Sequence, residues 1–332
     1  MLMRFVLPLG AALCLAPVAQ AQPYVLVADA VGDKIVRYNA NTSLPFDHFV
    51  GKGLSPLAAP MYMREMPDGR IAVASRDSNS IEVYDEATGE WDETLVQAGS
   101  SSLSGPKAFC FDDEGNIYVS SSINNRVLKY NSSGAFVRIL IEVGLDDPSG
   151  LTVGPDGNLY VCSRGNNKVR FYDTETGERI DIVNTTAVPL LAPNDINFDD
   201  GGNMYISGRD SNNIIRVTAF GGASVFVPTG PGLLQSPGQI IFNDMGNLIV
   251  ACPGSNSVLE YAVPSALFIE SLVSSANLGG LNTVGGVAFG PLATTRDACE
   301  VADLDFNGFL NVDDIELFVD SFLGDGCDEP TP

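Results

Sequence analysis

The chain has 332 residues, of which 45% are hydrophobic and 18% charged, so it has enough apolar residues for a large core. Its 41 Asp and Glu residues outnumber its 18 Lys and Arg residues, which gives a formal net charge of -23 at pH 7. Such a chain repels phosphate backbones and anionic membrane surfaces, so we expect no nucleic-acid partner and instead a cationic partner or a divalent ion.

Residues 1–21 are typical of a secretory signal peptide. Arg4 supplies a short positive region, FVLPLGAALCLAPV an apolar core, and the segment from Ala19 to Ala21 a small-residue cleavage site. Cleavage is therefore expected between Ala21 and Gln22. The apolar run is too short to span a bilayer, and a strand pattern follows it at once. We predict an exported protein, secreted or periplasmic, without a membrane span.

One strand-rich unit recurs through residues 22–291, and its clearest copy runs from Pro148 to Asp173. In PSGLTVGPDGNLYVCSRGNNKVRFYD the first two apolar runs are joined by Asp156-Gly157, which supplies the positive φ of a short hairpin turn. The third run, KVRFY, alternates as a half-buried strand does, and a weaker fourth strand is expected near Arg179 to Val183. Since one such sheet cannot bury its own faces, neighbouring copies must bury them.

The copies follow one another at the length of a propeller blade. Their turn glycines recur in steps of 42 to 46 residues, at Gly69, Gly115, Gly157, Gly202 and Gly246. A sixth copy is divided between the chain ends, because Tyr24 to Tyr38 supplies middle strands and Gly285 to Gly290 an inner strand. We predict that these two segments pair in one sheet. The fold is then an all-β, six-bladed β-propeller whose closure removes exposed sheet edges.

The repeated pattern, close to PxGLxxxxDGNLYVxxxxNNRVxxYD, resembles the NHL-repeat and gluconolactonase-like (SMP-30) family of six-bladed propellers. The copies between Tyr24 and Gly290 carry the resemblance, which covers about four fifths of the chain. It implies the architecture. It implies no single activity, because propellers host enzymes, binding modules and scaffolds.

Some residues recur at fixed places in the copies, so we expect them to serve the architecture. A tyrosine ends the third strand of five copies, with Val217 in the remaining one, and an asparagine lies in the preceding turn of five copies, with Asp33 in the sixth. The recurring residues are Tyr38, Tyr84, Tyr130, Tyr172 and Tyr261, and Asn79, Asn125, Asn167, Asn212 and Asn256. Within the strand patterns, Cys110, Cys162 and Cys252 are predicted to be small buried hydrophobes.

Function is expected where the copies differ, in the loops that lead into the inner strands around the central channel. The candidate ligand-binding residues there are Tyr62, Lys107, Ser149, Asn194, Asp195 and Gln239. Gluconolactonase-like lactonases hold a divalent ion at the channel mouth with a Glu, two Asn and an Asp. Only Asn194-Asp195 resembles one of these ligand positions, with a strand-leading turn as its alternative interpretation, and Lys107 would repel a cation.

Other catalytic patterns are missing from the sequence. The single histidine, His48, lies outside these loops, which excludes a zinc site of several histidines and a pair of histidine bases. We expect it to be an ordinary strand residue. No GxSxG motif or phosphate-binding glycine loop occurs. In the long connection from Val263 to Gly286 we predict an outer fourth strand, with a lip of the channel as the alternative.

The composition changes at Cys299, after which the chain has ten acidic residues and no Lys or Arg. DLDFNGFLNVDD matches the spacing of a calcium loop, with a glycine at its sixth position. The predicted Ca²⁺ ligands are Asp303, Asp305, Asn307, the carbonyl of Phe309, Asn311 and Asp314. The alternative is an Asp-Gly-rich turn before a short helix.

An Asp at the twelfth loop position, in place of the Glu of a standard EF-hand, resembles the dockerin form of the loop. Dockerins carry two such segments and bind cohesin modules, whereas residues 299–332 contain one. The resemblance implies a reduced module that anchors or sorts an exported protein through a cohesin-like or cell-surface partner. Cys299 and Cys327 bracket the module, and an oxidising compartment would let them form a disulfide.

Two functions follow from the sequence. The favoured one is a secreted, monomeric, calcium-binding propeller that binds a protein or glycan through its loop-bearing face and is retained outside the cell by its tail. The alternative is a metal-dependent lactonase or related hydrolase that uses the channel mouth near Asn194 and Asp195.

We predict that the tail binds one calcium ion independently of the propeller. Three loop carboxylates repel one another without a cation, and Asp314 is a short final ligand, so a dissociation constant of roughly micromolar to millimolar is expected. Calorimetry and circular dichroism of the oxidised fragment from Cys299 to Pro332 should detect heat of binding and a gain of helix. An Asp303→Ala, Asp314→Ala double variant that binds calcium as well as its parent would contradict the prediction.

Overall fold

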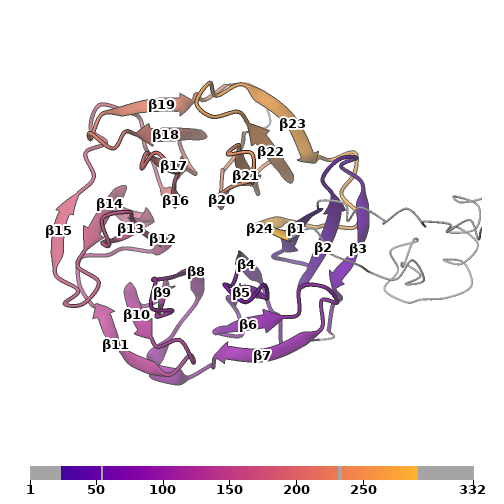
Figure 1. Ribbon diagram of the computed structural model, residues 1–332, viewed down its shortest axis with the longest axis horizontal. Helices are drawn as coiled ribbons and strands as arrows, with labels where there is room; N and C mark the ends of the chain where they lie inside the picture. The colour runs from indigo at the N-terminus through magenta and orange to yellow at the C-terminus, as the bar shows by residue number, and fades with distance from the viewer. Residues whose placement is uncertain (1–23, 54, 231–233, 291–332) are drawn as a thin grey trace, which may run out of the picture.

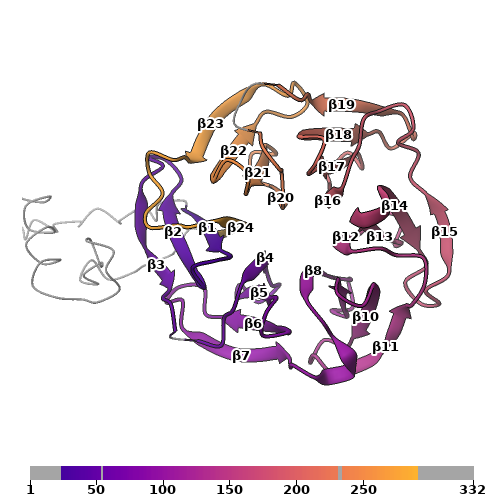
Figure 2. The same ribbon diagram turned by 180° about the vertical axis from the view of Figure 1, so that it is seen from behind.

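The computed structural model describes residues 24–53, 55–230 and 234–290, which form six four-stranded antiparallel sheets arranged as a ring (Figures 1 and 2). The predicted all-β, six-bladed propeller is thereby confirmed. The predicted signal peptide, the calcium loop and the cysteines at 299 and 327 lie outside the described residues. Across the ranges that are described, no helix is long and apolar enough to cross a membrane.

Each blade runs from an inner strand near the axis to an outer strand at the rim (Figure 1). Blade 1 contains β24 (Val284–Gly290), β1 (Tyr24–Asp29), β2 (Lys34–Asn39) and β3 (Pro45–Val50). Blade 2 contains β4 (Pro60–Glu65), β5 (Ile71–Ser75), β6 (Ser80–Tyr84) and β7 (Trp91–Val96). Blade 3 contains β8 (Pro106–Phe111), β9 (Ile117–Ser121), β10 (Arg126–Tyr130) and β11 (Phe136–Ile141).

The other three blades follow the same order. Blade 4 contains β12 (Pro148–Val153), β13 (Leu159–Ser163), β14 (Lys168–Tyr172) and β15 (Arg179–Ile182). Blade 5 contains β16 (Pro193–Phe198), β17 (Met204–Gly208), β18 (Asn213–Val217) and β19 (Ala223–Val227). Blade 6 contains β20 (Ile240–Phe242), β21 (Leu248–Cys252), β22 (Ser257–Tyr261) and β23 (Phe268–Val273). Two short 3-10 helices, η1 (Ser100–Ser102) and η2 (Arg164–Asn166), interrupt the loops.

Blade 1 is built from both ends of the described chain, as the sequence predicts. The last strand, β24, pairs antiparallel with β1, from Tyr24 opposite Gly290 to Val27 opposite Val287. Beyond an irregularity the pairing ends with Asp29 opposite Val284. In Figure 1 the yellow β24 accordingly lies beside the indigo β1. The pairing closes the ring and covers the edge of β1 that would otherwise face the axis. Every residue of β1 is accordingly buried.

The recurring tyrosines are packing residues of the seams between blades. All five are buried at the ends of the third strands, and Tyr261, for example, belongs to the same apolar cluster as Tyr205 of the preceding blade. Blade 5 has Val217 at this place. Beside that smaller side chain lies an open groove between blades 4 and 5, lined by aromatic residues that include Tyr160 and Phe198. Because Val217 replaces the recurring tyrosine, the seam between blades 4 and 5 is incompletely filled.

The recurring asparagines join each blade to the next. All five, and Asp33, have a positive φ between 47° and 60°, and their side-chain oxygen accepts a hydrogen bond from a backbone N–H at or just before the start of the next inner strand. The acceptor–donor pairs are Asp33 with Ala59 (2.8 Å), Asn79 with Gly105 (2.7 Å), Asn125 with Asp147 (2.7 Å), Asn167 with Ala192 (2.6 Å), Asn212 with Ser236 (2.7 Å) and Asn256 with Val284 (3.2 Å). Together these bonds form a complete circle.

Several smaller predictions are also confirmed. Gly157 has a φ of 77° in its hairpin turn, and the outer strands β15 and β23 occupy the expected segments. His48 lies in β3, an outer strand. Cys110, Cys162 and Cys252 are fully buried free thiols, and burial raises the pKa of Cys110 to about 12, so its thiol stays protonated.

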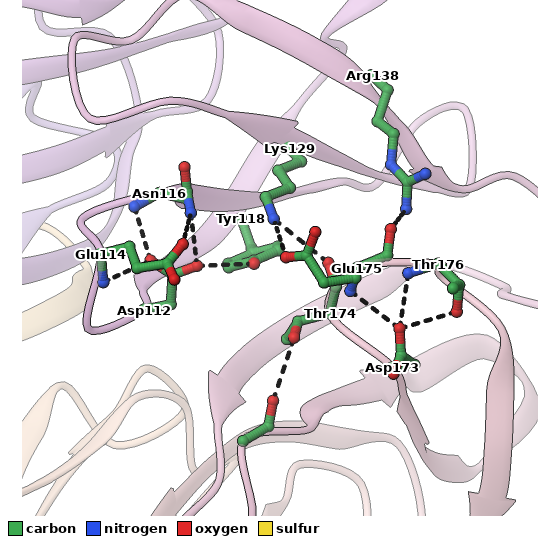
Figure 3. Close-up of polar contacts among 11 residues, drawn as sticks. Asp112, Glu114, Asn116, Tyr118, Lys129, Arg138, Asp173, Thr174, Glu175 and Thr176 are labelled. Atoms are coloured by element: carbon green, nitrogen blue, oxygen red, sulfur yellow. Dashed lines mark hydrogen bonds and ion pairs between the residues drawn. The ribbon is translucent and has the colours of Figure 1, made fainter.

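A polar cluster secures the seam between blades 3 and 4 (Figure 3). The ammonium of Lys129 donates to Glu175 Oε1 at 2.8 Å and to the carbonyl of Thr174 at 3.4 Å, and Arg138 donates to the carbonyl of Glu175. Lys129 Nζ also lies 5.3 Å from the centroid of the Tyr118 ring. Since the Glu175 side chain is 76% exposed, its ion pair contributes little, and the backbone acceptors hold the turn.

We predict that Asn79→Ala lowers the free energy of unfolding by roughly 2 kcal/mol. The substitution removes the bond to Gly105 and leaves at a positive φ an alanine, which tolerates this left-handed conformation less well than asparagine does. Asn79→Asp is the matched control, because Asp33 makes the same bond in blade 1, and we expect it to cost much less. Urea unfolding measures both, and equal losses for the two variants would contradict the account.

Candidate functional site

One cavity of about 180 Å³ lies at the axis, where the chain enters the inner strands. Its wall takes residues from all six blades. We call this end of the channel the mouth, and the surface around it the mouth face. The turns between second and third strands, such as the one at Asn79, belong to this face, whereas the hairpin glycines lie at the opposite end of the strands. The mouth is where the loops that differ between copies converge.

The six candidate residues all line this cavity, but they differ in how far their polar groups are already used. The hydroxyl of Ser149 donates to the carbonyl of Pro193 at 3.1 Å. Gln239 Oε1 accepts from the N–H groups of Met63 (3.2 Å) and Val287 (2.9 Å), and its Nε2 donates to the carbonyl of Met63 at 2.6 Å. Both side chains are buried and tie different blades together. Their contacts are those of framework residues.

Lys107 and Asn194 remain half-buried at the mouth. The ammonium of Lys107 donates to Asp147 Oδ1, while Arg164 Nε donates to Asp147 Oδ2 at 2.7 Å. Burial alone would raise the pKa of Asp147, but these two cations outweigh it and lower the pKa below its ordinary value. One carboxylate thus compensates only one of two adjacent positive charges.

Arg209 adds a third cation to the cavity wall, and it forms no ion pair with any residue of the described ranges. Three cations, Lys107, Arg164 and Arg209, therefore line the wall, whereas Asp195 is its one carboxylate among the described residues and Asp147 pairs with two of the cations from outside the lining. This local excess is opposite in sign to the net charge of -23 of the whole chain. A concave site with such a potential attracts anions and repels cations.

Asp195 is a buried carboxyl of the cavity wall with a raised pKa. It is 1% exposed, and burial raises its pKa to about 7, although the N–H of Ile240 and the charge of Arg64 favour the ionised form. Its Oδ2 accepts from the N–H of Ile240 at 2.9 Å, whereas Oδ1 has no hydrogen-bond partner among the described residues. Gly150 makes room for this carboxyl, since a β-carbon there would lie 2.1 Å from Oδ1. The group changes charge near neutral pH.

Sequence reasoning missed Arg164 and Arg209. They follow the second strand of blades 4 and 5, whereas the predicted residues lie in the loops that lead into the first strands. The signal was available in the repeats, because the residue after the second strand also varies between copies. The residues at this position of the six blades are Arg76, Ser122, Arg164, Arg209, Pro253 and Ala30.

The mouth does not fit the divalent ion that the gluconolactonase-like resemblance implies. Hard cations take six or more oxygen ligands, whereas the oxygen donors here are few and one oxygen of Asp195 already accepts from a backbone N–H. Lys107, Arg164 and Arg209 line the same space and would repel the ion. Within the described ranges, no three His, Cys, Asp or Glu side chains gather in a way that could hold a metal.

Comparison with known proteins places the chain among propellers. Residues 62–221 match a family described as lactonase, 7-bladed beta-propeller, which is just under half of the chain. The described residues, by contrast, form six sheets. No curated protein sequence matches the chain.

Solved structures with the same fold have low sequence identity. The nidogen/laminin complex contains a chain with a TM-score of 0.66 and 17% identity, over 81% of this chain and 98% of that one. A protein of unknown function from Bacteroides caccae has a TM-score of 0.63 and 14% identity, over 81% and 99%. A streptogramin B lyase has a TM-score of 0.52 and 16% identity, over 68% and 72%. At such identities the likeness establishes the propeller fold alone.

We predict that Asp195 makes stability fall as the pH rises. Between the ordinary value of 3.8 and about 7, the folded chain holds a proton that the unfolded chain has released. The free energy of unfolding should therefore decrease by up to about 1.4 kcal/mol per pH unit in this window and level off above it. Asp195→Asn cannot titrate and should lack this decrease. Urea titrations from pH 4 to 8 measure it, and parallel profiles for the two proteins would refute the assignment.

Proposed function

We propose that the chain is an exported binding module that takes a protein or glycan ligand at the mouth face of its propeller. The observation that carries this proposal is the contrast between the frame and the mouth. Every blade repeats the same inter-blade hydrogen bond, whereas each blade contributes different residues to the cavity. Asn194 and Arg209 line it without a side-chain hydrogen bond or ion pair to any described residue, so their polar groups remain for a ligand.

Apolar side chains in the loops of the mouth face support binding of a larger partner around the cavity. Val31, Ile123, Val143 and Leu191 are between 49% and 80% exposed, and all four lie in loops at this end of the strands. Single exposed apolar residues are common, but here they accompany a charged concave centre. A polar centre with apolar contacts around it suits a ligand that covers the face.

The proposal extends to both ends of the sequence. Residues 1–21 would export the protein and be removed after Ala21, and residues 299–332 would bind calcium and hold the propeller outside the cell as a monomer. The sequence patterns of these segments support this part, and calcium is plentiful outside cells.

The match of residues 62–221 to a lactonase family favours one second candidate, hydrolysis of a lactone at the same mouth. Asp195, with a pKa of about 7 in a cavity wall, has the protonation behaviour that a general base needs. A metal-dependent form is not proposed, because the residues of the mouth do not fit the ion.

We predict that Asn194→Trp, which fills the mouth, abolishes ligand binding. Met245→Trp is the matched control, since Met245 is 77% exposed in the β20–β21 turn on the opposite face. Immobilised acidic and neutral polysaccharides, and the proteins of the culture medium, serve as probes. At least one probe should bind the natural chain and the control but not Asn194→Trp. Equal binding by both variants would defeat the proposal, and turnover of simple lactones that Asn194→Trp abolishes would favour the hydrolase.

A further inference from the structure

We propose that the group recognised at the mouth is a sugar acid, a single sugar-sized unit that carries a carboxylate, either free or at the end of a longer glycan. The inference rests on the proposed function, because it names the ligand class of the same cavity. Three features of the wall lead to it: an excess of cations, a buried acceptor without a donor, and the size of the space.

The cations of the cavity wall favour an anionic ligand. Arg164 and Lys107 share the single carboxylate of Asp147, and Arg209 has no ion pair among the residues described. A half-buried guanidinium has lost part of its hydration, which an anion in the cavity would replace. Arginine also presents a planar fork of N–H donors that matches a carboxylate with two parallel hydrogen bonds. Among the described residues, Asp195 is the one carboxylate that lines the wall, so none of these residues supplies the missing anion.

The uncharged part of the ligand should carry hydroxyl groups. Asn194 offers an amide donor and an acceptor to the cavity, and its side chain makes no hydrogen bond to a described residue. Asp195 Oδ1 is a buried acceptor without a donor, and leaving such an atom unpaired costs free energy. Ligand hydroxyls can satisfy both residues, whereas a purely aliphatic acid cannot.

The volume limits the ligand to one small unit. About 180 Å³ is less than the roughly 300 to 1,000 Å³ of a pocket for a drug-sized molecule. A folded peptide segment or an oligosaccharide therefore does not fit inside, but one sugar ring with a carboxylate does. Further units of a glycan would extend over the mouth face.

The test compares two sugars that differ only in the charged group. Calorimetry on the full chain with D-galacturonate and D-galactose should detect binding of the acid, with affinity falling as salt is raised, and no binding of the neutral sugar. Arg209→Gln should weaken galacturonate binding at least tenfold. Arg179→Gln is the matched control, because Arg179 is exposed on the outer strand β15, and it should leave the affinity unchanged.

Equal binding of galactose and galacturonate, or an Arg209→Gln variant that binds as its parent does, would overturn the inference. If acetyl-glycine binds as tightly as galacturonate, the assignment of the ligand as a sugar is overturned, and the mouth is a general carboxylate site. These results are separable from the proposed function. If a polysaccharide or protein probe depends on Asn194 but not on Arg209, the mouth is the binding face and its ligand is not a sugar acid. If no probe depends on Asn194, the proposed function itself fails.

Discussion

The structure depends on a hydrogen bond that is repeated between every pair of adjacent blades. In each case a side-chain oxygen in a left-handed turn accepts a hydrogen bond from a backbone N–H at or just before the start of the next inner strand. The bond fixes where the next blade begins relative to the last. The β1–β24 pairing completes the first blade, and the bond from Val284 to Asn256 joins that blade to the last one, so the position of each inner strand at the axis follows from its neighbour.

This regular frame explains how a strongly acidic chain can hold a cationic mouth. The inner strands are placed by backbone and asparagine contacts, so the residues beside them can vary without altering the ring. Lys107, Arg164 and Arg209 occupy such variable places on three successive blades. They are brought together by the geometry of the ring and not by their spacing in the sequence, and they make anions the favoured ligands of the cavity.

The period of the repeats was sufficient to predict the blades, the shared first blade, the outer strands and the architectural columns. It did not indicate that the asparagines bond across seams, because a repeat pattern contains no information on which neighbour a turn meets. For a similar reason, the repeats did not indicate that Ser149 and Gln239 are framework residues, because their hydrogen-bond partners lie in other blades. Arg209 was missed because two different columns of the repeat converge on one cavity, a fact of three-dimensional arrangement. The groove beside Val217 follows from a single smaller side chain in its column.

The most direct measurement of the central claim is a crystal structure of the full chain grown with D-galacturonate. The account predicts one sugar ring in the mouth, with its carboxylate within hydrogen-bonding distance of the Arg209 guanidinium and hydroxyls directed to Asn194 and Asp195. Density for a divalent ion between Asn194 and Asp195, or for the sugar acid anywhere except the mouth, would contradict it.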